Sequence, residues 1–114
     1  MQHPPSFDDG RPPFDSVFAR ELIGKYVLVG VTVEDRQGKT IRHEQFHGAV
    51  VSANAESGIN LILRGVREGE SKWLPPATDV FSVAPPGSYS LRSTGETVAN
   101  PDFTSQWVLV QPDA

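Results

Sequence analysis

Residues 41–63 decide the fold, and they read Ile41-Arg42-His43-Glu44-Gln45-Phe46-His47-Gly48-Ala49-Val50-Val51-Ser52-Ala53-Asn54-Ala55-Glu56-Ser57-Gly58-Ile59-Asn60-Leu61-Ile62-Leu63. The first part of this stretch contains the zinc-protease pattern His-Glu-x-x-His. The second part has the composition of a bent strand, a tight turn and a further strand. The two patterns predict different proteins, because the first needs a helix and the second a small β-barrel.

The residues around the zinc pattern favour a strand. In a metalloprotease, residues four apart share one face of a helix, so both imidazoles reach one zinc. Here Gly48 follows His47 directly, and the β-branched pair Val50-Val51 comes next. Because side chains alternate along a strand, His43 and His47 share one face while Glu44 points to the other. We therefore expect no catalytic residue, no metal and no cofactor, with a zinc-dependent hydrolase through His43, Glu44 and His47 as an alternative.

Other catalytic patterns are weaker. Glu68 and Glu70 are downstream candidates for a third zinc ligand. Ser52, His47 and Asp79 have the residue types of a hydrolase triad, but no G-x-S-x-G turn accompanies them. The chain has no cysteine, which excludes disulfides, thiol nucleophiles and thiolate metal sites. These patterns add no support to an enzyme.

The flanking sequence predicts one domain with a short helix and several strands. Four prolines among polar residues at 1–14 predict a disordered tail, and residues 15–114 are expected to form a single small β-barrel domain with a C-terminal extension. The capping residues Asp15 and Ser16 and the terminating Gly24 predict a helix at 16–23. Alternation and turn residues predict strands at 26–33, 72–74 and 80–83, and a final strand pair made of 89–92 and 103–110.

The charge of the chain argues against nucleic acid as the main partner. The net charge is −4, so the molecule as a whole repels phosphate backbones, and we expect no DNA binding. Six basic and four acidic residues lie between Arg36 and Lys72, which leaves a local excess of +2. No apolar run reaches the length of a membrane span, and the N-terminus lacks the basic start and apolar run of a secretory signal. We therefore expect a soluble, cytoplasmic protein that does not bind membranes.

The order of helix, strand, turn, bent strand, turn and strand resembles the Sm-like family of small β-barrels, which are five-stranded and SH3-like. The resemblance rests on residues 22–27, on 48–51, on Asn54 and on 59–63. Gly48 suits the corner of a bent strand because it has no Cβ. The resemblance implies a mostly β fold, namely a small Sm-like or SH3-like barrel with a short N-terminal helix, to which the C-terminal strand pair is an addition.

Sm-like proteins commonly assemble into rings and often bind RNA. In their RNA-binding members, the equivalents of Asn60 and of a later basic-Gly pair hold the base and its phosphate. In place of that pair this chain has the segment 74–80, Leu-Pro-Pro-Ala-Thr-Asp-Val. We therefore expect a non-catalytic binding module that acts through a protein partner or through self-association at unclosed strand edges. The alternative is RNA binding, with the candidate contacts Asn54, Asn60, Arg64 and Lys72. Two aromatic residues that could stack on bases, Phe46 and Trp73, are expected in the core instead.

Overall fold

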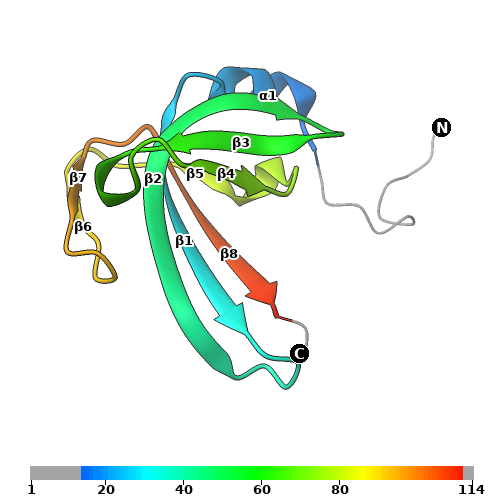
Figure 1. The fold of residues 1–114 in the computed structure, drawn as a ribbon. Coiled ribbons are helices and arrows are strands. Elements are labelled where there is room, and N and C mark those ends of the chain that lie inside the picture. The colour runs from blue at the N-terminus through cyan, green and yellow to red at the C-terminus, as the bar shows by residue number, and fades with distance from the viewer. Residues whose placement is uncertain (1–13, 112–114) are drawn as a thin grey trace.

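The computed structural model describes residues 14–111, and the predicted tail lies outside them except for Phe14. The described chain is mostly β, as expected (Figure 1). Its elements, in order, are α1 (Ser16–Leu22), β1 (Tyr26–Glu34), β2 (Thr40–Asn54), β3 (Gly58–Leu63), the 3₁₀ turn η2 (Gly65–Arg67), β4 (Ser71–Leu74), the 3₁₀ turn η3 (Thr78–Val80), β5 (Phe81–Val83), β6 (Ser88–Ser90), β7 (Thr97–Ala99) and β8 (Phe103–Val110).

The strands form one large curved sheet and one small sheet. The large sheet has the order β4-β3-β2-β1-β8-β5, and the small one pairs β6 with β7. Within residues 14–111, β4 and β5 are the two edges of the large sheet, so the sheet is open and closure into a barrel is not shown. Figure 1 shows β1, β2 and β8 running side by side beyond the rest of the domain.

The predicted helix is confirmed, and its start has the expected cap. The Asp15 carboxylate accepts hydrogen bonds from the backbone N–H groups of Val17 and Phe18, at 3.0 and 3.1 Å. The helix ends before Gly24, which adopts a φ of +87°. Because Leu22 is fully buried, the helix is fixed against the core of the sheet.

Strand β1 has two unequal faces. The valines at 27, 29, 31 and 33 are buried and define what we call the inner face of the sheet. The other residues of β1 are half-buried and define the outer face. Strand β2 runs antiparallel to β1, with Val31 opposite Glu44 and Thr32 opposite His43. The face of every residue on β2 follows from this register.

The prediction for the C-terminal strands was wrong in its pairing. Residues 88–90 pair with β7, a strand that the sequence analysis did not identify, and not with 103–110. Strand β8 instead joins the large sheet, parallel to β1 and antiparallel to β5. The physical reason is length, because β8 pairs with β1 from Val27 to Glu34, whereas 89–92 offers a single short strand.

Strand β2 bends where β3 comes closest to it. A Cβ added at Gly48 would lie 2.2 Å from the backbone oxygen of Ile62, so only glycine fits there. The expectation that this glycine shapes the strand is confirmed. A bulge between Val50 and Ser52 adds to the bend, and the sequence analysis did not predict it.

The core lies on the inner face and contains Phe46, as expected, but not Trp73. Phe46 is almost fully buried beside Leu61 and Leu63. Trp73 is 56% exposed, and its indole N–H donates to the Ser57 carbonyl at 2.8 Å.

In the part of the chain that the structure describes, no helix has the length and apolarity needed to cross a membrane.

The close approach at Gly48 makes a testable prediction. Gly48→Ala should lower the free energy of unfolding by about 1–3 kcal/mol, because the new methyl group meets backbone that cannot yield. Gly30→Ala is the matched control, since its Cβ would meet only the mobile end of the Gln106 side chain. Urea denaturation measures both. Equal stability of the two variants would contradict the steric role of Gly48.

Candidate functional site

The residues of the zinc pattern lie on both faces of strand β2. Glu44 is on the inner face, where it pairs with Arg42 at 2.9 Å. His43 is on the outer face, and its Nδ1 is 3.2 Å from the Thr32 hydroxyl. His47 shares the outer face but lies four residues along the strand, which is about 13 Å at the rise of a β-strand. The strand assignment and the separation of Glu44 from the histidines are therefore confirmed.

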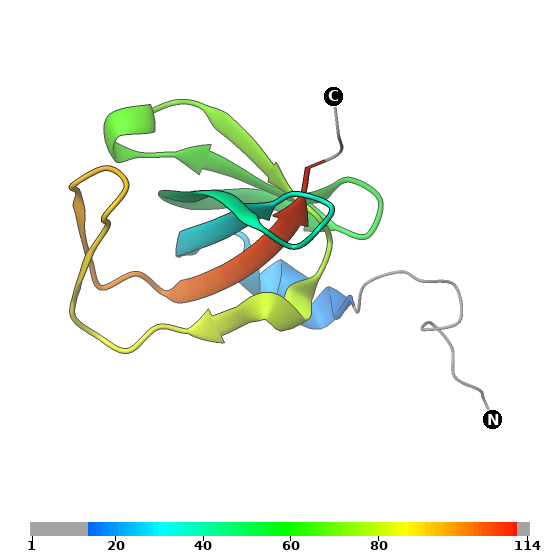
Figure 2. The same ribbon diagram turned by 90° about the horizontal axis from the view of Figure 1, so that it is seen from below.

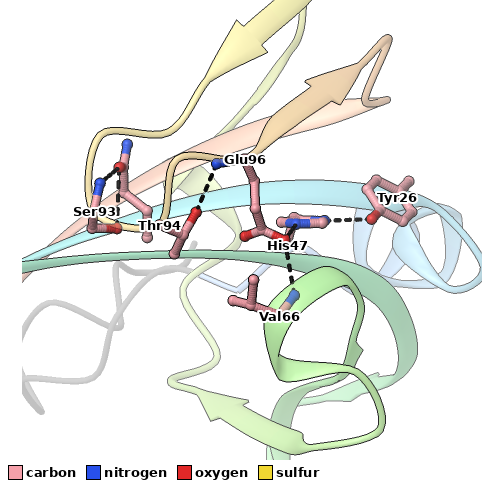
Figure 3. A network of polar contacts seen from close by, with 7 residues as sticks. Tyr26, His47, Val66, Ser93, Thr94 and Glu96 are labelled. Atoms are coloured by element: carbon pink, nitrogen blue, oxygen red, sulfur yellow. Dashed lines mark hydrogen bonds and ion pairs between the residues drawn. The ribbon is translucent and has the colours of Figure 1, made fainter.

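His47 takes part in a buried polar network, which Figure 3 shows. Its side chain is only 6% exposed. Nδ1 is hydrogen bonded to the Tyr26 hydroxyl, and Nε2 lies 3.1 Å from Oε2 of Glu96. The same Glu96 oxygen accepts a hydrogen bond from the Val66 backbone N–H at 2.9 Å. Both ring nitrogens of His47 thus have partners within the chain.

The network ties the small β6–β7 sheet to the outer face of the large one. Gln45 strengthens this tie, because its Oε1 accepts hydrogen bonds from the N–H and the hydroxyl of Ser93 at 3.0 and 3.2 Å. Gly65 allows Glu96 to approach, since a Cβ there would be 1.8 Å from Oε2. We call this arrangement the clasp. Its polar groups form hydrogen bonds with one another.

Two groups of the clasp have shifted pKa values. The hydrogen bond from the Val66 N–H lowers the pKa of Glu96, and those from Thr94 and His47 add to the effect against the opposing influence of burial. Burial raises the pKa of Tyr26.

Among residues 14–111 no group of three or more His, Cys, Asp or Glu side chains could hold a metal ion.

The other candidate catalytic residues do not meet His47. Ser52 accepts a hydrogen bond from Asn60 at 3.2 Å, while the His47 ring contacts Tyr26 and Glu96. Asp79 lies in η3, which contacts β8 and, through the Thr78 hydroxyl, the Asp15 backbone N–H. Glu70, a candidate zinc ligand, instead pairs with Arg67 at 3.0 Å.

The structure brings Asn54 and Asn60 together at the β2–β3 turn. Asn54 Oδ1 accepts hydrogen bonds from the backbone N–H groups of Glu56 and Ser57, at 3.1 and 2.7 Å. Asn60 Nδ2 is 3.2 Å from the Ser57 carbonyl, to which it donates. Both side chains therefore stabilise the turn.

The two basic RNA candidates lie away from that turn. Arg64 follows the far end of β3 and pairs with Glu68 at 3.2 Å. Lys72 points to the inner face, where its ammonium lies 5.3 Å from the centroid of the Phe46 ring. The four candidate residues thus do not form one patch.

A groove on the inner face is a feature that the sequence analysis missed. It has a volume of about 370 Å³ and lies between β4 and the far ends of β1, β2 and β8. Its lining is mainly apolar, with Arg42, Glu44 and Lys72 as charged members. The apolar lining residues include Val31, Val33, Leu74, Pro75, Trp107 and Leu109.

One border of this groove is an uncovered strand edge. Strand β5 pairs only with residues 103–105 of β8. Figure 2 shows the sheet from below, with β5 in yellow-green beside the first part of β8 in orange-red. Within the described residues, no backbone hydrogen bond joins 106–110 to another segment on the side away from β1, although the turn η3, which precedes β5, also contacts β8. The Gln111 N–H donates to the Glu34 carbonyl of β1, so by alternation the N–H groups of Gln106, Val108 and Val110 point to the open side.

The uncovered edge is apolar and uncharged. Val108, Leu109 and Val110 are 62%, 44% and 60% exposed. The run 103–111, Phe-Thr-Ser-Gln-Trp-Val-Leu-Val-Gln, contains no charged residue, proline or glycine. Folded proteins usually protect such edges with charges, prolines or bulges, so an exposed edge of this kind is a place where another strand can add.

Comparisons with protein-family models, with curated proteins and with solved structures found no match to this chain. No relative therefore assigns a role to any of its residues.

The clasp predicts a specific pH dependence of stability. Because the pKa of Glu96 is lower in the folded chain than its usual value near 4.5, the unfolded chain takes up the proton first as the pH falls. Ionised Glu96 therefore stabilises the fold above that usual value, and this stabilisation is lost as the pH falls through the lowered pKa. Glu96→Gln should be less stable than the parent protein at neutral pH, by a gap that narrows in acid.

Urea denaturation at a series of pH values measures this gap. Glu68→Gln is a suitable control, because Glu68 lies on the surface and its pair with Arg64 is open to solvent. We expect a smaller loss for this variant at neutral pH. A gap for Glu96→Gln that stays constant from neutral to acidic pH would show that its charge does not stabilise the clasp.

Proposed function

We propose that this protein is a non-catalytic binding module, a divergent relative of the Sm-like small β-barrels, that holds an extended polypeptide segment of a protein partner. The observation that carries the proposal is the uncovered edge of β8 next to the apolar groove. An added strand would extend the large sheet at residues 106–110, and its side chains on the inner face would enter the groove.

The groove offers such a segment both backbone and side-chain contacts. The outward N–H and C=O groups of Gln106, Val108 and Val110 can form main-chain hydrogen bonds, which give affinity independent of sequence. Leu109 and Trp107 on the inner face would contact the side chains of the added strand. Burial of the exposed apolar surface at Leu109 favours the complex.

The two alternatives receive less support from the geometry. A zinc hydrolase needs its general base beside the metal, but Glu44 is on the face opposite to His43 and His47. RNA binding needs polar groups that face solvent together, but Asn54 and Asn60 are used in the β2–β3 turn. Lys72, the fourth candidate, lies against Phe46.

Partner capture from the native host tests the proposal. Leu109→Lys places a charge in the groove, and we expect recovery of the partner to fall by about tenfold or more, because binding would then desolvate an unpaired ammonium. Val66→Lys is the control, since Val66 is an exposed apolar residue of η2 that lies away from the groove lining. Thermal denaturation of both variants checks that each one folds. Equal recovery by the two variants would contradict a role for the groove.

Nucleotide and metal binding separate the alternatives. We expect no binding of oligo-uridine or oligo-adenosine at low salt and no stoichiometric zinc in the purified protein. Tight, salt-sensitive binding that is weakened by Arg64→Ala or Lys72→Ala would replace the proposal with an RNA-binding function. Stoichiometric zinc that is lost on substitution of His43 or His47 would replace it with a metal site.

A further inference from the structure

We infer that the strand that adds to β8 is β8 of a second copy of this chain, in a two-fold symmetric dimer. The inference rests on the proposed function, because it names the partner for the same edge and groove. Its starting point is that the exposed edge is uncharged over the whole run 103–111, while the chain carries a net charge of −4. Two such edges can therefore meet without bringing like charges into direct contact.

Symmetry makes an edge of this kind self-complementary. In a two-fold interface the same surface serves both copies, so each residue must accept a residue from the same strand as its neighbour. An apolar strand meets this condition, since valine packs on valine and leucine on tryptophan. A strand patterned with charges of one sign would not meet it.

The backbone selects one register. With the two strands antiparallel and Val108 opposite Val108 of the second copy, Gln106 lies opposite the second Val110. The residues whose N–H and C=O groups point outward are then paired with each other, and each pair can exchange two hydrogen bonds. A shift by two residues would place Gln106 opposite Pro112, which has no N–H to donate.

The same register keeps the two faces of the sheet consistent. A two-fold axis perpendicular to the sheet leaves inner faces on one side, so residues opposite one another must have the same orientation. Val108 then packs on its counterpart on the outer face, and Leu109 lies beside Trp107 of the second copy on the inner face. The contact covers the exposed apolar side chains of the edge and narrows the opening of each groove.

The dimer is limited to the far half of β8. Strand β5 occupies the edge at 103–105, and Pro112 follows the described end of the chain. Figure 1 shows that the far half of β8 extends beyond β5 with the ends of β1 and β2, so a second copy can approach it from the open side. The contact is therefore short, and the fraction of the protein that is dimeric depends on protein concentration.

Disulfide trapping tests the register directly, because the chain has no native cysteine. In an antiparallel hydrogen-bonded pair the Cα atoms are about 5.5 Å apart, which a disulfide can bridge. Val108→Cys should therefore form a covalent dimer under mild oxidation. Val110→Cys is a matched control on the same edge with similar exposure, and it should form far less, since its counterpart in the dimer is about 14 Å away along the strands.

Val66→Cys gives the rate expected from random collision of an exposed residue. A Val108→Cys rate no higher than that of Val66→Cys would overturn the inference. A faster reaction of Val110→Cys than of Val108→Cys would overturn the register and with it the dimer as described.

Sedimentation velocity without cross-linking provides the second measurement. The parent protein should shift from monomer to dimer as its concentration rises. Val108→Lys should weaken this association at least tenfold, because it places two ammonium groups opposite each other, while Val66→Lys should leave it unchanged. A parent protein that stays monomeric at high concentration would overturn the inference.

The two proposals fail separately. If the parent protein is monomeric and Val108→Cys does not cross-link, but Leu109→Lys still loses a captured partner, the second copy is ruled out and the proposed function stands. If the dimer forms and Leu109→Lys has no effect on capture of any partner, the edge serves self-association, and the binding of a different protein is ruled out.

Discussion

The close approach of β2 and β3 at Gly48 is the constraint on which the rest of the structure depends. At this residue β2 has β1 on one side and β3 on the other, and the Ile62 backbone oxygen occupies the space where a Cβ would lie. The bend gives the large sheet its curvature, so that β4 faces the inner side of the far half of β1 and β8. The groove between them is the space that this curvature leaves uncovered.

The polar clasp lies on the outer face of the large sheet, opposite to the groove. A buried histidine with two partners, a tyrosine and a carboxylate, is stable because each polar group has its hydrogen bonds satisfied. The clasp holds the small β6–β7 sheet over the outer face of β1 and β2. The inner groove and the edge of β8 lie outside this cover, which is consistent with a module that binds through an edge.

Much of the local structure could be predicted from the sequence, because it depends on neighbouring residues. Gly48 and the valines after His47 exclude a helix, and alternation then separates Glu44 from the histidines. Asp15 and Gly24 define the helix between them through capping and a positive φ. These features need no knowledge of what packs from elsewhere in the chain.

The parts that could not be predicted depend on distant partners. The parallel pairing of β8 with β1 is set by contacts more than seventy residues apart, and nothing local distinguishes it from a hairpin with 89–92. His47 becomes buried only because Glu96 and Tyr26 close over it. Trp73 was expected in the core because it lies in a strand. Its indole N–H instead donates to the Ser57 carbonyl, and the ring lies against Gly58, where a Cβ would clash with it. The uncharged run 103–111 was the one visible signal of the exposed edge.

Amide hydrogen exchange of β8, resolved by residue, tests most directly the claim that its uncovered edge is the binding surface. In the dilute protein the amides of Trp107 and Leu109, which face β1, should be protected, and those of Gln106, Val108 and Val110 should exchange rapidly. As the protein concentration rises, protection should appear at the second set and leave the first unchanged. If Gln106, Val108 and Val110 exchange at the same rapid rate at every concentration and with every captured partner, the edge is not a binding surface.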